Sequence, residues 1–179
     1  SFPLICGSIM SKKIAEGIQG LVLDIKIGNG AFIPDSKEAN QLGSLLSLIG
    51  KEFNVDVHYT TTDMNQPLGS YAGLLCEVHE SIQCLKGNGA TDLMDVVFHL
   101  GERALTIAGK NNPKKRMMDV INNGRALEVL YKMIYEHGGD YKKIQLRNQN
   151  SIDIISEGEG YLKYINTKKI GHIINFLTI

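Results

Sequence analysis

Apolar periodicity predicts an α/β fold built on a parallel sheet. A helical pattern over 8–20 precedes a β-branched apolar run over 21–27. A second helical pattern, from Ser36 through Ile49, precedes a second such run over 55–61. Helices that alternate with strands at this spacing are typical of βα units, whose strands pair in parallel and place ligands at their carboxyl ends.

Size and charge limit the classes of protein. A chain of 179 residues with 43% hydrophobic content can bury one sizeable core and at most a small second subdomain. Nineteen basic residues balance nineteen acidic ones, so no overall field favours nucleic acid or an anionic membrane. No apolar run approaches the roughly 20 residues of a membrane-spanning helix. We expect a cytoplasmic protein with small-molecule or protein partners.

The cysteines and histidines form no ligand cluster in the sequence. Cys6, Cys76 and Cys84 include no C-x-x-C pair and lie among apolar residues, which favours a reducing compartment. No histidine joins Cys76 and Cys84 at ligand spacing, so we expect core packing rather than metal binding. The five histidines are scattered, and only His58 lies near a predicted strand end.

The first helix is predicted over 8–20. Apolar residues recur every four positions from Met10 to Ile18, and polar residues lie opposite. Ser8 would cap the start of this helix, and Gly20 would end it.

The first strand, 21–27, is mostly apolar with two polar exceptions, Asp24 and Lys26. Residues two apart on a strand point to the same side, so these two form either a buried ion pair or a catalytic pair. The ion pair is the simpler interpretation.

The second helix is predicted to be capped by Ser36 and followed by a strand over 55–61. Its apolar face is marked at i, i+3, i+4 and i+7 by Leu42, Leu45, Leu46 and Ile49.

Two loops follow the strands. The run Gly28-Asn29-Gly30-Ala31-Phe32 suggests a phosphate loop, but it lacks both the Walker lysine and the full dinucleotide motif, and a tight turn explains it. Asp63, Asn65 and Gln66 could form a site, although a turn made by Asp, Asn and Pro is an adequate explanation.

Three helices are predicted in the second half, over 71–85, 93–108 and 114–137. Gly-Asn-Gly and Asn-Asn-Pro separate them, and Gly124 interrupts the third at some cost in helix propensity.

A domain boundary is predicted in the polar, glycine-marked segment 138–150. Beyond it, 152–155 and 161–164 resemble short strands, and Thr167 opens a final helix. We therefore divide the chain into a central α/β domain, 1–138, and a linker with the start of a second α/β domain, 139–179. The apolar residues at the two ends of the chain suggest that it is part of a longer protein.

Ser8 and Lys12 are the leading candidates for chemistry. Four residues apart at a predicted helix start, they would share one face where backbone N–H groups favour negative charge, a suitable place for an anionic leaving group. The alternative is that Ser8 is only an N-cap and Lys12 only a solvated charge.

Four sequence blocks, in order, resemble the thymidine and pyrimidine-nucleoside phosphorylase family. They are Ser8-Ile-Met-Ser-Lys-Lys-Ile-Ala-Glu-Gly17, Leu23-Asp-Ile-Lys-Ile-Gly-Asn-Gly-Ala-Phe32, Thr62-Asp-Met-Asn-Gln-Pro-Leu-Gly69 and Asn123-Gly-Arg-Ala126. The resemblance extends from Pro3 to Ile179. It implies part of a parallel-sheet nucleoside phosphorylase catalytic domain with several helices, followed by the start of that family's C-terminal α/β domain.

The resemblance implies a reversible phosphorolysis, in which phosphate attacks the anomeric carbon of a pyrimidine (deoxy)ribonucleoside. Negative charge builds on the departing base, so donors aimed at its carbonyls and N3 stabilise the transition state most. By resemblance, Ser8 and Lys12 are these donors, and Ile5 and Phe32 are the apolar walls beside the pyrimidine.

The resemblance also implies a monovalent cation, K⁺ or Na⁺, and no organic cofactor. The cation would be held by the carbonyls of Leu68 and Tyr71 and the side chain of Glu80. The family acts as a homodimer on nucleoside and inorganic phosphate.

The family's phosphate-binding Lys-His-Ser-Thr-Gly-Gly loop precedes the matching region. We therefore expect this polypeptide alone to show no phosphorolysis. A different hypothesis is a binding module derived from the family that holds a nucleoside or a protein without turnover.

Overall fold

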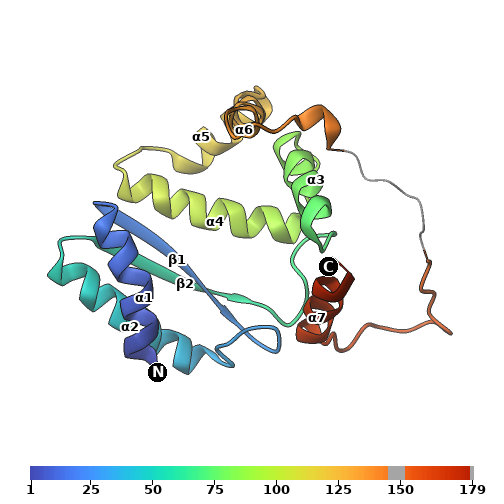
Figure 1. The fold of residues 1–179 in the computed structure, drawn as a ribbon, viewed down its shortest axis with the longest axis horizontal. Helices are drawn as coiled ribbons and strands as arrows, with labels where there is room; N and C mark the ends of the chain where they lie inside the picture. The colour runs from blue at the N-terminus through green and yellow to red at the C-terminus, as the bar shows by residue number, and fades with distance from the viewer. Residues whose placement is uncertain (145–151, 178–179) are drawn as a thin grey trace.

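A computed structural model describes residues 1–144 and 152–177 (Figure 1). In chain order, the elements are α1 (Phe2–Ala15), β1 (Gly20–Ile27), α2 (Ser36–Glu52), β2 (Asp56–Asp63), α3 (Leu74–Leu85), α4 (Thr91–Ile107), α5 (Pro113–Asn122), α6 (Arg125–Glu136), the 3₁₀ turn η1 (Tyr141–Lys143) and α7 (Thr167–Leu177).

The predicted α/β architecture with parallel pairing is confirmed. β1 and β2 pair in parallel with Gly20 opposite Asp56 and Ile27 opposite Asp63. Helices α1 and α2 cover one face of this two-stranded sheet, and α4 crosses the other (Figure 1). Both strands end beside the segment that leads into α7.

The core lies between the sheet and the helix pair α1 and α2. Its buried members are Cys6, Met10, Ile25, Ile33, Ala39, Leu42 and Leu46. Helix α2 approaches β2 closely because two of its residues are glycine. A Cβ at Gly43 would overlap the ring of Tyr59, and one at Gly50 would overlap Val57. The sequence therefore sets the distance between this helix and the sheet.

Helix α1 differs from its prediction at both ends. It begins at Phe2, six residues before Ser8, because Cys6 packs into the core one turn ahead of Met10. It ends at Ala15 rather than at Gly20. Gly17, with a φ of +71°, takes the left-handed conformation and donates its N–H to the carbonyl of Ile14.

Helix α2 begins at Ser36 as predicted, but its cap is Asp35. That carboxylate accepts the N–H of Glu38 at 3.0 Å, since Asp35 has the extended backbone of an N-cap. The predicted apolar face is correct except at Leu45, which is 38% exposed.

The predicted helix 114–137 is two helices. Gly124 has a φ of +78° and donates its N–H to the carbonyl of Ile121. This left-handed glycine separates α5 from α6. Helix α3 starts at Leu74, three residues later than expected, and α4 spans nearly the predicted range.

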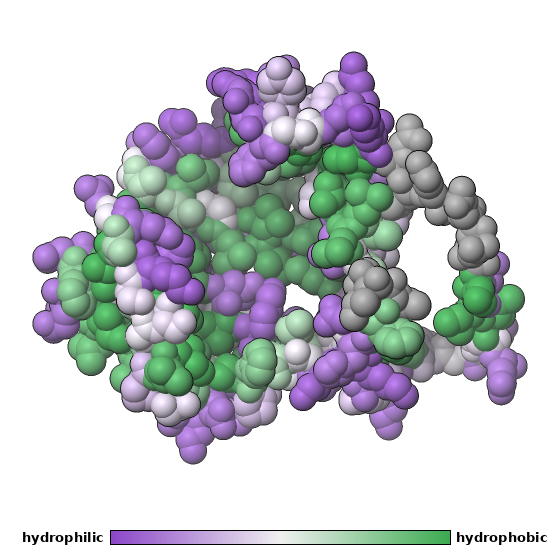
Figure 2. All heavy atoms as spheres, in the orientation of Figure 1, coloured by the Kyte–Doolittle hydropathy of each residue, from purple (hydrophilic) through white to green (hydrophobic). Residues whose placement is uncertain are grey.

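The prediction of two strands after residue 151 is wrong. Residues 152–155 and 161–164 have no strand pairing in the described structure, and Ile152, Ile154 and Ile155 are 83–96% exposed. They form the green cluster beside the grey trace in Figure 2. A strand needs a partner, and none of the described segments pairs with them. Helix α7 begins at Thr167 as predicted.

The predicted boundary segment, 138–150, extends into residues 145–151, which lie outside the described residues, and the boundary stays a prediction. Within the described residues, no helix has the length and apolar character required to cross a membrane.

Candidate functional site

The outward face of α1 carries three of the four candidate base contacts. Cys6 and Met10, each 1% exposed, turn one side of this helix into the core. Ile5, Ser8 and Lys12, spaced i, i+3 and i+7, therefore lie together on the opposite side, and all three are exposed. The predicted sharing of one face by Ser8 and Lys12 is confirmed.

The predicted reason for anion binding at this face is wrong. Ser8 lies in the middle of α1 and Lys12 in its last turn, where the helix dipole is negative and stabilises a lysine. Ser8 is therefore no N-cap. A negatively charged ligand on this face would be attracted by the ammonium group of Lys12 and not by free N–H groups at a helix start.

Adjacent lysines on α1 have different partners. The Nζ atom of Lys13 lies 3.1 Å from an oxygen of Glu16. Lys12 forms no ion pair or side-chain hydrogen bond with any residue that the structure describes. Its three N–H donors are therefore available to a ligand.

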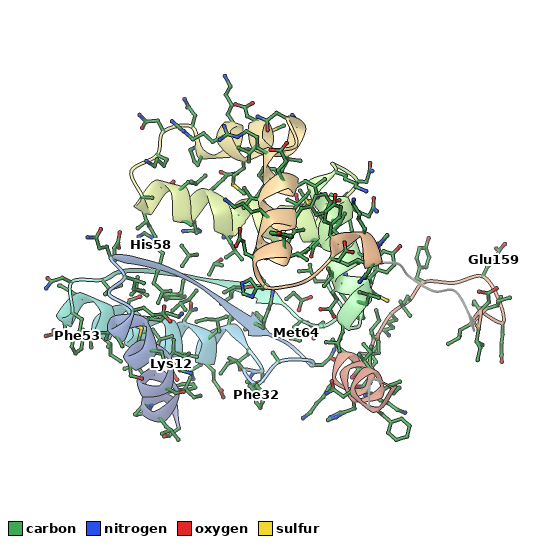
Figure 3. All side chains as sticks on the ribbon, turned by 45° about the horizontal axis from the view of Figure 1, so that its top comes forward. Lys12, Phe32, Phe53, His58, Met64 and Glu159 are labelled. Atoms are coloured by element: carbon green, nitrogen blue, oxygen red, sulfur yellow. The ribbon has the colours of Figure 1, made fainter. Side chains whose placement is uncertain are left out.

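The two apolar candidates are open to solvent. Phe32, on the loop after β1, is fully exposed at 104%, and Ile5 is 36% exposed. Figure 3 shows Phe32 on this loop and Lys12 on the neighbouring helix α1. Because a fully exposed ring packs against no neighbour, Phe32 and Ile5 do not form a closed pocket in this structure.

Asp24 and Lys26 form an ion pair, which confirms the simpler interpretation. Their charged atoms are 2.7 Å apart, with side chains 18% and 36% exposed. Thr62 on β2 completes the network, accepting from Lys26 at 2.8 Å and donating to Asp24 at 2.6 Å. Thr62 was not among the predicted residues. It lies opposite Lys26 in the parallel register of β1 and β2.

The loops after the strands are turns, as the simpler interpretation held. Asp63 accepts the N–H of Asn65 at 3.1 Å, which is an Asx turn. Gly28 has a φ of +111°, and a Cβ there would overlap the side chain of Asn65. The loop after β1 therefore packs directly on the loop after β2.

One predicted cation ligand, Glu80, is a buried carboxylate that lies against the loop carrying the other two. Glu80 on α3 is 5% exposed and accepts the N–H of Ser70 at 2.6 Å. Gly69, with a φ of +76°, passes so close that a Cβ would overlap the carboxylate. A cavity of about 330 Å³ adjoins this loop and is lined in part by Ser70 and Tyr71.

The predicted cation ligands are all oxygen atoms. A buried carboxylate needs a positive partner or several donors, and the described residues provide Glu80 with one hydrogen bond and no ion pair. They contain no cluster of three or more His, Cys, Asp or Glu side chains. A cation here would therefore take carbonyl oxygens, such as those of Leu68 and Tyr71, and this one carboxylate.

Two of the five histidines, His58 and His99, lie in a separate region between β2 and α4. His58 pairs with Asp56 at 3.2 Å near the start of β2, not at a strand end. His99 Nε2 lies 3.0 Å from the hydroxyl of Thr60 and accepts from Arg103 at 3.2 Å. An open cavity of about 940 Å³ is lined by Asp56, His58, His99 and Arg103 but not by Thr60. None of the candidate base contacts lines this cavity.

The three cysteines are free thiols, as expected. Burial raises the pKa of the Cys6 thiol. Burial also raises the pKa of Cys84, and the nearby carboxylate of Glu80 raises it further. Cys84 packs in the core as predicted, whereas Cys76 is only half-buried.

Two curated relatives match nearly the whole chain. A thymidine phosphorylase of Metamycoplasma hominis is 39% identical over 172 residues, which cover 91% of this chain and 63% of the relative. A pyrimidine-nucleoside phosphorylase of Staphylococcus aureus is 36% identical over 180 residues, covering 96% of this chain and 42% of the relative. The chain thus spans less than two thirds of either relative. No protein-family model matches it.

Proposed function

We propose that this chain, which is homologous to thymidine and pyrimidine-nucleoside phosphorylases, provides the pyrimidine-binding side of such an active site. The observation that carries the proposal is the outward row on α1, in which Lys12 has no side-chain partner among the described residues while Lys13 pairs with Glu16. An ammonium group on an exposed helix face with no competing carboxylate can donate to a negatively charged ligand.

The chemistry follows from the charge that develops during phosphorolysis. Phosphate attacks the anomeric carbon as the bond to the pyrimidine nitrogen breaks, and the bonding electrons leave with the base. The Lys12 ammonium can donate to a carbonyl oxygen of that base, and the Ser8 hydroxyl can donate to a carbonyl oxygen or accept from N3–H. Because these hydrogen bonds strengthen as negative charge grows, they lower the barrier rather than only tighten substrate binding.

Ile5 and Phe32 supply apolar contact. A pyrimidine is a flat ring with two polar edges, and apolar side chains against its faces would leave the edges to Ser8 and Lys12. Since Phe32 is fully exposed, a bound base would cover surface that is now in water.

The cation site is proposed at Glu80 with the carbonyls of Leu68 and Tyr71. The buried carboxylate supports the proposal because it has one hydrogen bond among the described residues. A bound K⁺ or Na⁺ would neutralise Glu80 and join the loop before α3 to that helix. We further propose, from the resemblance alone, that the whole protein is a cytoplasmic homodimer acting on pyrimidine nucleosides and phosphate.

NMR mapping of thymine and uracil tests the base site. We expect each base to shift amide signals of α1 and of the loop 28–33. Shifts confined to the cavity lined by His58 and His99, or no shifts at millimolar base, would contradict the proposal. Binding by the whole protein without phosphate-dependent release of base would favour a binding module instead.

A further inference from the structure

The side chain of Asn29 joins two segments that are far apart in the sequence. Its Nδ2 donates to the carbonyl of Ile165 at 3.0 Å, and its Oδ1 accepts the N–H of Thr167 at 2.9 Å. A carbonyl can only accept and a backbone N–H can only donate, so these two partners fix which way the Asn29 amide points. The contact therefore requires both halves of an amide.

Asn29 also contacts the loop after β2. Its backbone N–H donates to Oδ1 of Asn65 at 2.9 Å, and its Nδ2 lies 3.2 Å from the same oxygen. One half-buried residue thus links the loop after β1, the loop after β2 and the segment that enters α7.

The loop after β1 has no room to move independently of these partners. Gly30 donates its N–H to the carbonyl of Met64 at 3.0 Å. A Cβ at Gly30 would lie 2.8 Å from that oxygen and 2.8 Å from Cγ2 of Thr167, which is itself 7% exposed. The loop therefore packs between the main chain of Met64 and the side chain of Thr167.

Phe32 depends on this loop for its position. Its ring is fully exposed, so no packing holds it, whereas the neighbouring Ile33 is buried in the core. The place of the ring is set by the backbone between the contacts of Asn29 and the buried side chain of Ile33.

We propose that Asn29 is a positioning residue that holds the Phe32 loop against residues 165–167, so that binding of a pyrimidine base depends on the segment that enters α7. The proposal rests on the proposed function, in which Phe32 is a wall of the base site. Asn29 itself need not touch the base.

Three variants test the link from both sides. Asn29→Ala removes the amide, and Asn29→Asp keeps the acceptor for Thr167 but places a second oxygen against the carbonyl of Ile165. Thr167→Pro removes the N–H that donates to Asn29 and also replaces the buried threonine side chain beside Gly30, at the first position of a helix, where proline is well tolerated. Asn166, whose Oδ1 accepts the N–H of Lys169 at 3.0 Å, caps that helix and is unchanged.

We expect each variant to weaken thymine and uracil binding by about fivefold, the effect of one or two lost hydrogen bonds. Asn88→Ala, at an exposed asparagine after α3, is the matched control and should bind normally. A double-mutant cycle that combines Asn29→Ala with Phe32→Ala tests positioning specifically. Once the ring is absent, Asn29→Ala should cause no further loss of affinity.

The outcomes separate the two proposals. No binding of base by the unaltered chain would overturn the proposed function and this role of Asn29 together. Normal binding by Asn29→Ala and Thr167→Pro, or losses that add fully to that of Phe32→Ala, would overturn the role of Asn29 alone. If Asn29→Ala fails to fold, Asn29→Asp and Thr167→Pro give the same decision.

Discussion

The ammonium group of Lys13 lies 3.1 Å from the carboxylate of Glu16, the residue that caps the end of α1, while the preceding lysine has no such partner among the described residues. Two neighbouring residues of identical chemistry thus have different environments. The pair at 13 and 16 is a surface ion pair of small energetic value, and the lysine at 12 is free to meet a ligand.

Lys12→Ala should abolish most base binding, and Lys13→Ala should not. Removing a charged donor from a bound base costs about 1.5–3 kcal/mol, which is about tenfold to a hundredfold in affinity. Breaking the exposed pair of Lys13 with Glu16 costs about 0.3–0.5 kcal/mol of stability and leaves the base site intact. Calorimetric titration with thymine measures both. Equal losses in the two variants would count against the role of Lys12.

Phe32→Ala should reduce base affinity without lowering stability. A fully exposed ring contributes nothing to the core, so the melting temperature should stay within about a degree of the original. Phe53, 56% exposed after α2, provides the matched control (Figure 3), and Phe53→Ala should bind base normally. Unchanged affinity in Phe32→Ala would exclude this ring from the site.

Asp24→Asn should destabilise the fold more than Thr62→Val. The first leaves the half-buried Lys26 ammonium with neutral acceptors and should cost about 1–3 kcal/mol, whereas the second removes one bridging hydroxyl and should cost about 1 kcal/mol. Urea unfolding measures both free energies. The double variant should cost less than the sum, because both changes break one network. Additive losses would show that the three side chains act separately.

The buried thiol of Cys84 should make stability fall at alkaline pH. Its folded pKa is raised above the ordinary value of 9.0, first by burial and then by Glu80. The folded state therefore keeps the proton where the unfolded chain has lost it. The stability is fully present below pH 9.0 and declines as pH rises from there through the folded pKa. Cys84→Ala should flatten this decline in urea unfolding between pH 8 and about pH 10.5, and an unchanged slope would contradict the assignment.

The half-buried Cys76 is the control for that series, because Cys76→Ala changes a thiol on the same helix. We expect its alkaline slope to match that of the unaltered chain.

The 179-residue polypeptide should show no phosphate-dependent release of thymine or uracil from their nucleosides. Its sequence contains no Lys-His-Ser-Thr-Gly-Gly loop, so the base side of the reaction has no partner to hold phosphate. Chromatography of the free base after incubation with thymidine or uridine and phosphate measures the activity. Turnover that Lys12→Ala abolishes would show that this expectation is wrong.

Local sequence patterns determined the kinds of most elements and several of their bounds. Alternating helix and strand periodicity predicted the parallel pair β1 and β2, and the apolar spacing of α2 identified Leu42 and Leu46 as core residues. These predictions succeeded because hydrophobic period and chain direction are local properties. The start of α7 at Thr167 was likewise readable from its flanking residues.

Only the tertiary structure decided the features that depend on distant partners. Packing of Cys6 moved the start of α1 to Phe2, and Gly17 ended the helix at Ala15, so Lys12 lies in a last turn rather than a first one. The contact of Asn29 with Ile165 joins residues 136 positions apart, and no local pattern in either segment encodes it. The sequence thus provided the candidate side chains, and long-range packing and hydrogen bonding decided which faces and loops present them.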